Sequence, residues 1–171
     1  VQDTMMTSKL TSTRNADFGL RNAEFTTHSA LHTPHSELRA DAMVTVVVCT
    51  YNRAESLKET LRALSVQQLG EEVALEVIVV DNNSTDHTAR VVDAVCRNGG
   101  WAIRYVHEAR QGISHARTRG AQEASGAIVA YTDDDVIPEP TWVQALWRAH
   151  REHSADCVGG RILLRWLRTP P

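Results

Sequence analysis

Apolar residues follow a regular pattern only from about residue 43 onward. Met43 to Cys49 is a continuous and mostly β-branched apolar run. Such a run is typical of a strand that is buried on both faces. Other short apolar runs predict strands at residues 75–80, 101–106 and 127–132, and residues 157–164 are consistent with a fifth strand.

Between these runs the apolar residues take a helical spacing. Leu57, Leu61 and Leu64 lie on one face of a helix that we expect over residues 54–68. Strands and helices that alternate in this way predict a parallel sheet with helices on both faces. The other helices are expected after a cap at Ser84 or Thr85 (with Ala89, Val92 and Cys96 on one face), over residues 113–125, and over residues 142–151.

Residues 1–42 differ in composition from the rest of the chain. They are polar, rich in Thr, Ser, Asn and His, and show no sustained period of a strand or helix. We predict a disordered tail or a non-native leader there. The domain is therefore expected to be residues 43–171.

Composition narrows the class of protein. The chain has 171 residues, of which 42% are hydrophobic and 23% charged, which suits one soluble globular domain. A net charge of -3 gives no reason to expect a nucleic-acid partner. No apolar run approaches the roughly 20 residues that span a bilayer, and no secretory signal is evident. Cys49, Cys96 and Cys157 are odd in number and far apart, and Cys49 and Cys157 lie in apolar segments. We therefore expect buried, reduced thiols in a cytoplasmic protein.

Polar residues follow each of the first four predicted strands. In an open parallel sheet, ligands bind beyond the carboxyl ends of the strands. Loops are polar in any case, and Asn, Asp and Ser favour turns, but all four strand ends carry hydrogen-bonding groups suited to a nucleotide. These segments are Thr50 to Arg53, Asp81 to Asp86, Glu108 to Gly112 and Asp133 to Asp135.

The acidic triplet Asp133, Asp134 and Asp135 is the strongest chemical signal. Two like charges about 5 Å apart repel by roughly 3 kcal/mol at an effective dielectric constant near 20. Alternate residues of an extended chain share a face, so Asp133 and Asp135 can converge while Asp134 looks away. Mg²⁺ or Mn²⁺ would remove the repulsion, and magnesium often binds one or two carboxylates together with substrate phosphates. A solvated loop or a helix N-cap remains an alternative for this triplet.

Four segments, in this order, resemble family 2 glycosyltransferases, which are inverting enzymes of the GT-A fold. The resemblance implies an α/β, Rossmann-like and mostly parallel sheet flanked by helices. It also implies that the chain is truncated, because the family's acceptor half and its catalytic base come later than residue 171. The segments are Val48 to Arg53, Val77 to Asp86, Gly112 to Arg117 and Gly126 to Asp135.

The resemblance also implies roles for particular residues. Asp81 would accept a hydrogen bond from the base, typically uracil, although a turn or cap role is the alternative. Arg117 would lie near the nucleotide-sugar, although it could also be a solvated helix residue. Thr118 stands where the family often has asparagine. The expected nucleotide-sugar residues are Thr50, Tyr51, Asn52, Arg53, Asp81, Asn83, Arg117, Asp133 and Asp134, and the expected metal ligands are Asp133 and Asp135.

The implied activity is metal-dependent, inverting transfer of a sugar from a nucleoside-diphosphate sugar, typically UDP-linked, to a hydroxyl of a glycan or lipid-linked acceptor. Cell-envelope polysaccharide synthesis from the cytoplasmic side would be the setting. A non-catalytic nucleotide-sugar-binding remnant is one alternative. A nucleotidyltransferase is another, but the loop Thr50 to Arg53 lacks the glycines and the several basic residues usual in that class.

The last segment alternates Arg161, Arg165 and Arg168 with apolar residues. One interpretation is peripheral attachment to the inner face of a membrane. The other is packing of this segment onto further parts of the domain.

Overall fold

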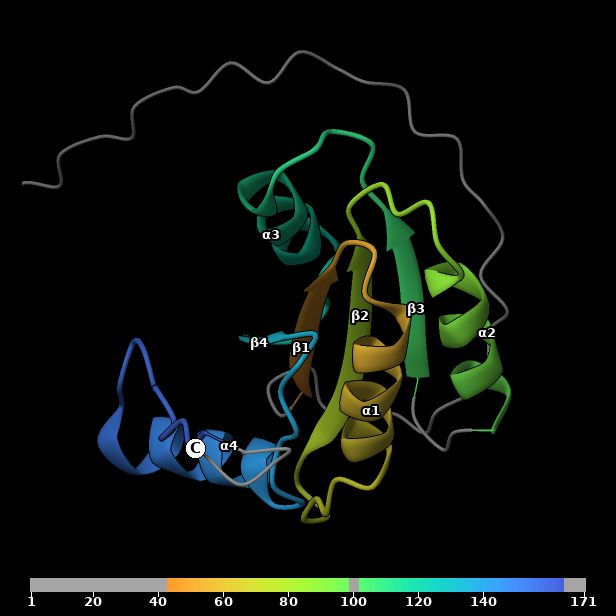
Figure 1. The fold of residues 1–171 in the computed structure, drawn as a ribbon. Helices are drawn as coiled ribbons and strands as arrows, with labels where there is room; N and C mark the ends of the chain where they lie inside the picture. The colour runs from red at the N-terminus through yellow and green to blue at the C-terminus, as the bar shows by residue number, and fades with distance from the viewer. Residues whose placement is uncertain (1–42, 99–101, 165–171) are drawn as a thin grey trace, which may run out of the picture. The chain divides into compact units, whose positions relative to one another are not determined.

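A computed structural model describes residues 43–98 and 102–164 of the chain. The tail predicted for residues 1–42 lies outside them. Within the described residues, strands and helices alternate as the sequence predicts (Figure 1). The elements are β1 (Met43–Thr50), α1 (Ala54–Ser65), β2 (Ala74–Asp81), α2 (Thr88–Asn98), β3 (Ala102–His107), α3 (Ile113–Glu123), β4 (Ile128–Asp133) and α4 (Trp142–His153).

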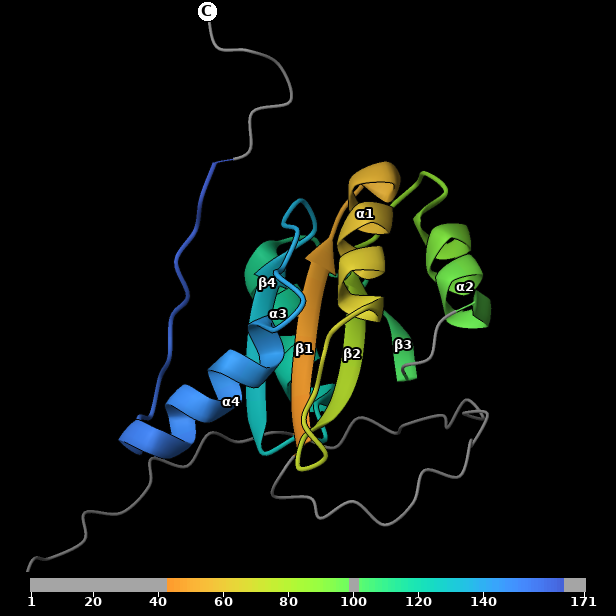
Figure 2. The ribbon, with the colours of Figure 1, turned by 90° about the horizontal axis from the view of Figure 1, so that it is seen from below.

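The four strands form one parallel sheet in the order β3-β2-β1-β4 (Figure 2). The chain moves outward from β1 to β3 and then returns, through α3, to the other side of β1. The order therefore reverses between β1 and β4. In open α/β sheets, the crevice at such a reversal is where ligands bind.

Both faces of the sheet are covered. Val44, Val46 and Val48 of β1 belong to the core that includes α1, α2 and α4. The alternate residue Val47 faces the second core, which includes Ala116 of α3. All four valines are fully buried, which confirms the prediction of a strand covered on both sides.

Gly120 lets α3 lie close to the sheet. A Cβ atom at this position would come within 2.3 Å of Val47 Cγ1, so even an alanine would collide with β1. A glycine at this position is thus a requirement of the packing of α3 on β1.

Several helix boundaries differ from the sequence prediction: α3 ends at Glu123 and α4 at His153, where the predicted ends are residues 125 and 151. Helix α1 ends at Ser65, three residues before the predicted end. Beyond it, the buried Gln67 side chain donates to Glu139 O and accepts from Val143 N–H at the start of α4. The residue that caps α2 is Asp86 instead of Ser84 or Thr85, because Asp86 Oδ1 accepts the Thr88 N–H at 2.9 Å.

The fifth strand expected over residues 157–164 is wrong, since this segment has no strand pairing in the described structure. Its apolar side chains have no core to enter: Ile162 and Leu164 are 84% and 82% exposed. For the same reason the expectation that Cys157 is buried is wrong, since this thiol is exposed. Among the described helices, none is both long and apolar enough to cross a bilayer.

Candidate functional site

The carboxyl ends of β1, β2 and β4 bring distant polar residues together. Thr50 is the register partner of Asp81 on β2, and Cys49 is the partner of Asp133 on β4. The sheet order reverses beside β1, and in open α/β sheets this is where ligands bind. The predicted site residues of these three strands therefore lie at one edge.

Asp134 points inward, toward the end of β1. The residue is 5% exposed, and its carboxylate accepts a hydrogen bond from Thr50 Oγ1 at 2.7 Å. Arg53 Nη1 lies 3.3 Å from the other carboxylate oxygen. Burial raises the pKa of Asp134, while Thr50 and Arg53 act in the opposite direction. Asp134 thus turns toward the end of β1, where Thr50 supplies the hydroxyl that binds it, while Asp133 and Asp135 stay exposed.

Asp133 and Asp135 are exposed and face different arginines. Arg53 Nη1 is 2.7 Å from Asp135 Oδ2, and Arg117 Nη2 is 3.7 Å from Asp133 Oδ1. The hydrogen bond to Asp135 and the nearby carboxylates raise the pKa of Arg53, so its charge is retained. Two arginines thus supply part of the positive charge that the acidic triplet requires.

The carboxylates fit a hard divalent cation that a ligand helps to hold. The described residues contain no group of three or more His, Cys, Asp or Glu side chains arranged around a metal. Asp133 and Asp135 offer exposed carboxylate oxygens, which is the donor type that Mg²⁺ and Mn²⁺ prefer. A cation that takes only one or two protein ligands must complete its shell with water and ligand phosphates.

Asp81 is almost fully buried, with 2% of its surface exposed. Ser84 N–H donates to Oδ1 at 2.8 Å, and the Tyr105 hydroxyl donates to Oδ2 at 2.6 Å. Burial and this hydrogen bond raise the pKa of Tyr105. The bond from Ser84 is a turn interaction, as the alternative interpretation expected. Each oxygen has a second lone pair, so the carboxylate retains capacity to accept from a base.

Asn52 organises the neighbouring loop. Its backbone has a positive φ of 51°, which asparagine tolerates better than most residues. Its side-chain oxygen accepts the Thr85 N–H at 2.7 Å, and its own N–H donates to Ser84 Oγ at 2.9 Å. Tyr51, next to it, is 47% exposed, and Asn83 is also exposed. These two side chains are open to a ligand, while Asn52 holds the loops that carry them.

Sequence reasoning missed Asn82, which fixes the loop between β3 and α3. The buried amide donates to Glu108 O at 3.1 Å and to Arg110 O at 2.7 Å, and it accepts the Gly112 N–H at 2.8 Å. In the same loop, hydrogen bonds from Arg110 lower the pKa of Glu108 to about 2. The only sequence signal was the position of Asn82 directly after Asp81.

Asp86 and Tyr105 were missed as well. Asp86 Oδ2 accepts the first N–H of α1, from Ala54, at 3.1 Å, while Oδ1 caps α2. One carboxylate therefore joins the starts of two helices at the site edge. Asp86 is a good N-cap residue type in the expected place, whereas nothing local in the sequence connects Tyr105 to Asp81.

Residues 45–165 match the family model for Glycosyl transferase family 2. The fold described above is the GT-A fold, which structural neighbours of this chain share. The chain belongs to glycosyltransferase family 2.

Three relatives illustrate the similarity. Glucosyl-dolichyl phosphate glucuronosyltransferase of Haloferax volcanii is 36% identical over 75% of this chain and 41% of its own length. The mannosyltransferase PcManGT of Pyrobaculum calidifontis, solved with GDP-Man and Mn²⁺, is 34% identical with a TM-score of 0.58, covering 68% of this chain and 33% of that one. TarS of S. aureus, solved with UDP, is 26% identical with a TM-score of 0.60, covering 71% and 38%.

The chain spans about two fifths of the length of three curated relatives that it matches, with 41%, 41% and 39% of them covered. The family and the fold apply to the matched residues.

Proposed function

We propose that this domain binds the donor in a metal-dependent, inverting transfer of a sugar from a nucleoside-diphosphate sugar to an acceptor hydroxyl. One observation carries the proposal: Thr50, Asp81 and the acidic triplet meet at the carboxyl edge beside the reversal of strand order. Membership in family 2 supports sugar transfer from a nucleotide-sugar.

Asp81 is the proposed base-recognition residue. An ionised carboxylate only accepts hydrogen bonds, so it selects a base edge that presents an N–H group. The uracil ring offers one such donor, and TarS is a relative solved with UDP. Thr50, Tyr51, Asn52, Arg53 and Asn83 complete the proposed nucleoside end of the site.

Asp133 and Asp135 are the proposed ligands of Mg²⁺ or Mn²⁺. Asp134, which lies between them in the sequence and accepts a hydrogen bond from Thr50, would support them. When bound, the cation would neutralise charge on the leaving diphosphate. Arg117, 3.7 Å from Asp133, stands where it can bind a phosphate oxygen once the cation takes its carboxylate partner. Arg53 is placed to do the same beside Asp135.

The relatives suggest two acceptor classes, since one is named for a dolichyl phosphate substrate and another for succinoglycan biosynthesis. We propose a glycan or lipid-linked acceptor accordingly. Cytoplasmic location is consistent with Cys49, Cys96 and Cys157, all of which are free thiols.

Titration calorimetry of the chain with UDP, in Mn²⁺ and then in EDTA, tests the proposal. We expect binding that needs the metal and that falls at least about tenfold in Asp135→Asn, because a charged ligand to the cation is lost. Asp156→Asn, which removes the same charge at an exposed position on the segment after α4, is the matched control. UDP binding without the metal, or equal UDP affinity of the Asp135→Asn and Asp156→Asn variants, would contradict the assignment of Asp135 as a metal ligand.

A titration with CDP alongside UDP tests the base assignment. We expect UDP to bind more tightly, because uracil N3–H can donate to the Asp81 carboxylate whereas cytosine N3 only accepts. Asp81→Asn should reduce that preference, because an amide can also donate. Hydrolysis of UDP-sugars in the same buffer separates an enzyme from a non-catalytic binding remnant. Transfer of a nucleotide instead of a sugar would favour the nucleotidyltransferase alternative.

A further inference from the structure

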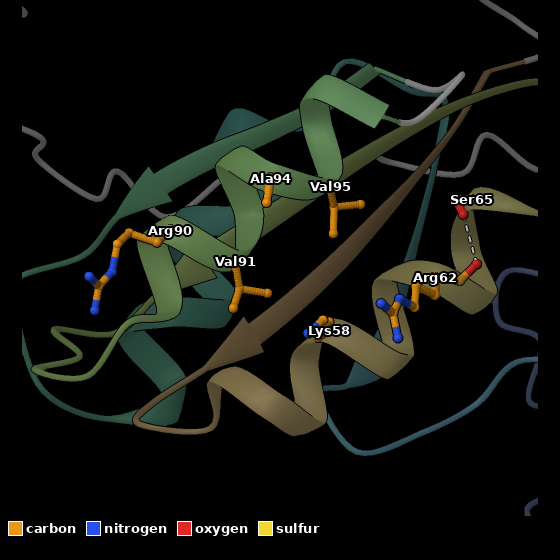
Figure 3. A pocket seen from close by; sticks show the side chains of 7 residues that line it. All are labelled: Lys58, Arg62, Ser65, Arg90, Val91, Ala94 and Val95. Atoms are coloured by element: carbon orange, nitrogen blue, oxygen red, sulfur yellow. Dashed lines mark hydrogen bonds between the residues drawn. The ribbon is translucent and has the colours of Figure 1, made fainter.

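Helices α1 and α2 lie side by side over the same face of the sheet (Figure 1). A groove runs between them, and Figure 3 shows the side chains that line it. Its volume is about 420 Å³. None of its lining residues belongs to the proposed donor site. They are Lys58, Arg62 and Ser65 of α1, and Arg90, Val91, Ala94 and Val95 of α2.

Positive charge is concentrated in this groove, which we call the α1–α2 groove. No carboxylate lines it, although the whole chain has a net charge of -3. Most arginines of the described residues have a carboxylate oxygen within 4.0 Å; these are Arg53, Arg97, Arg104, Arg110, Arg117, Arg119 and Arg151.

Arg62 and Arg90 have no such ion pair among the described residues, and outside the groove the same holds for Arg148 and Arg161. Lys58 has only Glu55, whose side chain is 73% exposed and lies at 4.0 Å. Lys58 and Arg62 are also one helical turn apart, where like charges destabilise a helix. An anion in the groove would relieve this repulsion.

The shape and lining favour a lipid phosphate over a soluble one. Val91 and Val95 are directed toward α1, between the basic side chains (Figure 3). Long basic side chains over an apolar floor suit the membrane interface, where stems contact apolar groups and charges contact phosphates. Compact phosphate sites use free N–H groups at a helix N-terminus, whereas Lys58, Arg62 and Ser65 lie inside or at the end of α1.

We propose that the α1–α2 groove binds phosphate groups of an anionic phospholipid surface. Both helices start at the edge that carries the donor site, where Asp86 joins their first turns. Docking through the groove would therefore hold that edge at a fixed height above the membrane. This attachment is independent of the proposed sugar transfer and is made by other residues.

Flotation with lipid vesicles tests the proposal, with EDTA present so that the acidic triplet cannot take part through a metal. The chain should bind vesicles that contain phosphatidylglycerol and not vesicles of phosphatidylcholine alone. Binding should weaken steeply with salt. The double variant R62Q/R90Q should lose about thirty-fold in affinity, since each cation near an anionic surface contributes about 1 kcal/mol.

R148Q/R161Q is the matched control, because it removes two exposed arginines that also have no ion pair among the described residues but lie outside the groove. It should bind as the unmodified chain does, and R62K/R90K should retain most of the binding. Circular dichroism and UDP titration of R62Q/R90Q should match the unmodified chain, which separates this test from the donor site.

Three results would overturn the proposal. One is vesicle binding that R62Q/R90Q retains and R148Q/R161Q loses, which would place the contact in the C-terminal segment. Another is equal binding to both kinds of vesicle. The third is no vesicle binding together with calorimetric binding of inorganic phosphate, which would make the ligand a soluble anion.

Discussion

Thr50 and Asp134 form a buried pair at the end of β1. The substitution Thr50→Val removes the hydroxyl that donates to the Asp134 carboxylate. We expect a loss of about 1–3 kcal/mol in the free energy of unfolding, because a buried acceptor loses its partner while side-chain volume is nearly unchanged. Urea denaturation measures it. Thr50→Ser keeps the hydroxyl and should lose clearly less; equal losses would mean that packing, not the hydrogen bond, is responsible.

Glu108 should make stability depend on acidic pH. Its pKa falls from the ordinary 4.5 to about 2 through Arg110, so its contribution is present above pH 4.5 and is lost as the pH falls toward 2. We expect about 1 kcal/mol, allowing for solvent screening at exposed Arg110. Urea denaturation between these pH values should show a smaller pH slope in Glu108→Gln. An unchanged slope would contradict the role of this pair.

At the scale of a residue, the sequence predicted which side chains gather at the edge but not what they contact. Thr50, Asp81 and the triplet were placed correctly at strand ends. The inward turn of Asp134 and the hydrogen bond from Tyr105 to Asp81 were not predictable, because each joins residues of different strands. No local pattern encodes such a pair.

The role of Asn82 in fixing the loop between β3 and α3 can be tested by substitution, because its amide forms hydrogen bonds at both ends of this loop. Asn82→Asp sets a carboxylate oxygen against Glu108 O and Arg110 O, so we expect about 2 kcal/mol or more of destabilisation, concentrated in this loop. Hydrogen exchange of the Gly112 amide reports it. Asn83→Asp is the same change at the exposed neighbour and should leave exchange nearly unaltered; loss in both variants would point to charge alone.

Helix α3 gives a second test between elements. Gly120→Ala would gain about 1 kcal/mol from helix propensity alone, but the added Cβ would lie 2.3 Å from Val47 Cγ1. We expect a net loss of about 1–3 kcal/mol by thermal or urea unfolding. Val47→Ala in the same chain should recover part of that loss, because the colliding methyl group is gone. Strictly additive losses would show that no collision occurs.

The helices and the four strands of the described sheet were predictable from the sequence, because each has its own pattern of apolar residues. The boundaries that shifted did so through contacts outside the element, as where Gln67 binds the start of α4. The expected strand at residues 157–164 failed for a related reason. An apolar run forms a strand only when a neighbouring strand pairs with it, and the described sheet supplies none there.

For the whole molecule, parallel pairing followed from the alternation of elements, but the order of strands did not. The sequence does not say that β4 lies beside β1, yet this placement brings Asp133 opposite Cys49 and reverses the strand order beside β1. Only the resemblance to family 2 glycosyltransferases, through their GT-A fold, implied this strand order. The contacts themselves are long-range and needed the structure.

Strand β4 is hydrogen-bonded to β1 alone within the described sheet, so its other side carries amide groups that can anneal with a second molecule. Purified chain should then self-associate as it is concentrated. Sedimentation velocity over a dilution series should show a rising average mass, with more oligomer at high protein. A monomer at every dilution would mean that the free edge of β4 is already shielded from pairing. Crystal contacts and interaction screens of the chain could then be interpreted without allowing for self-association.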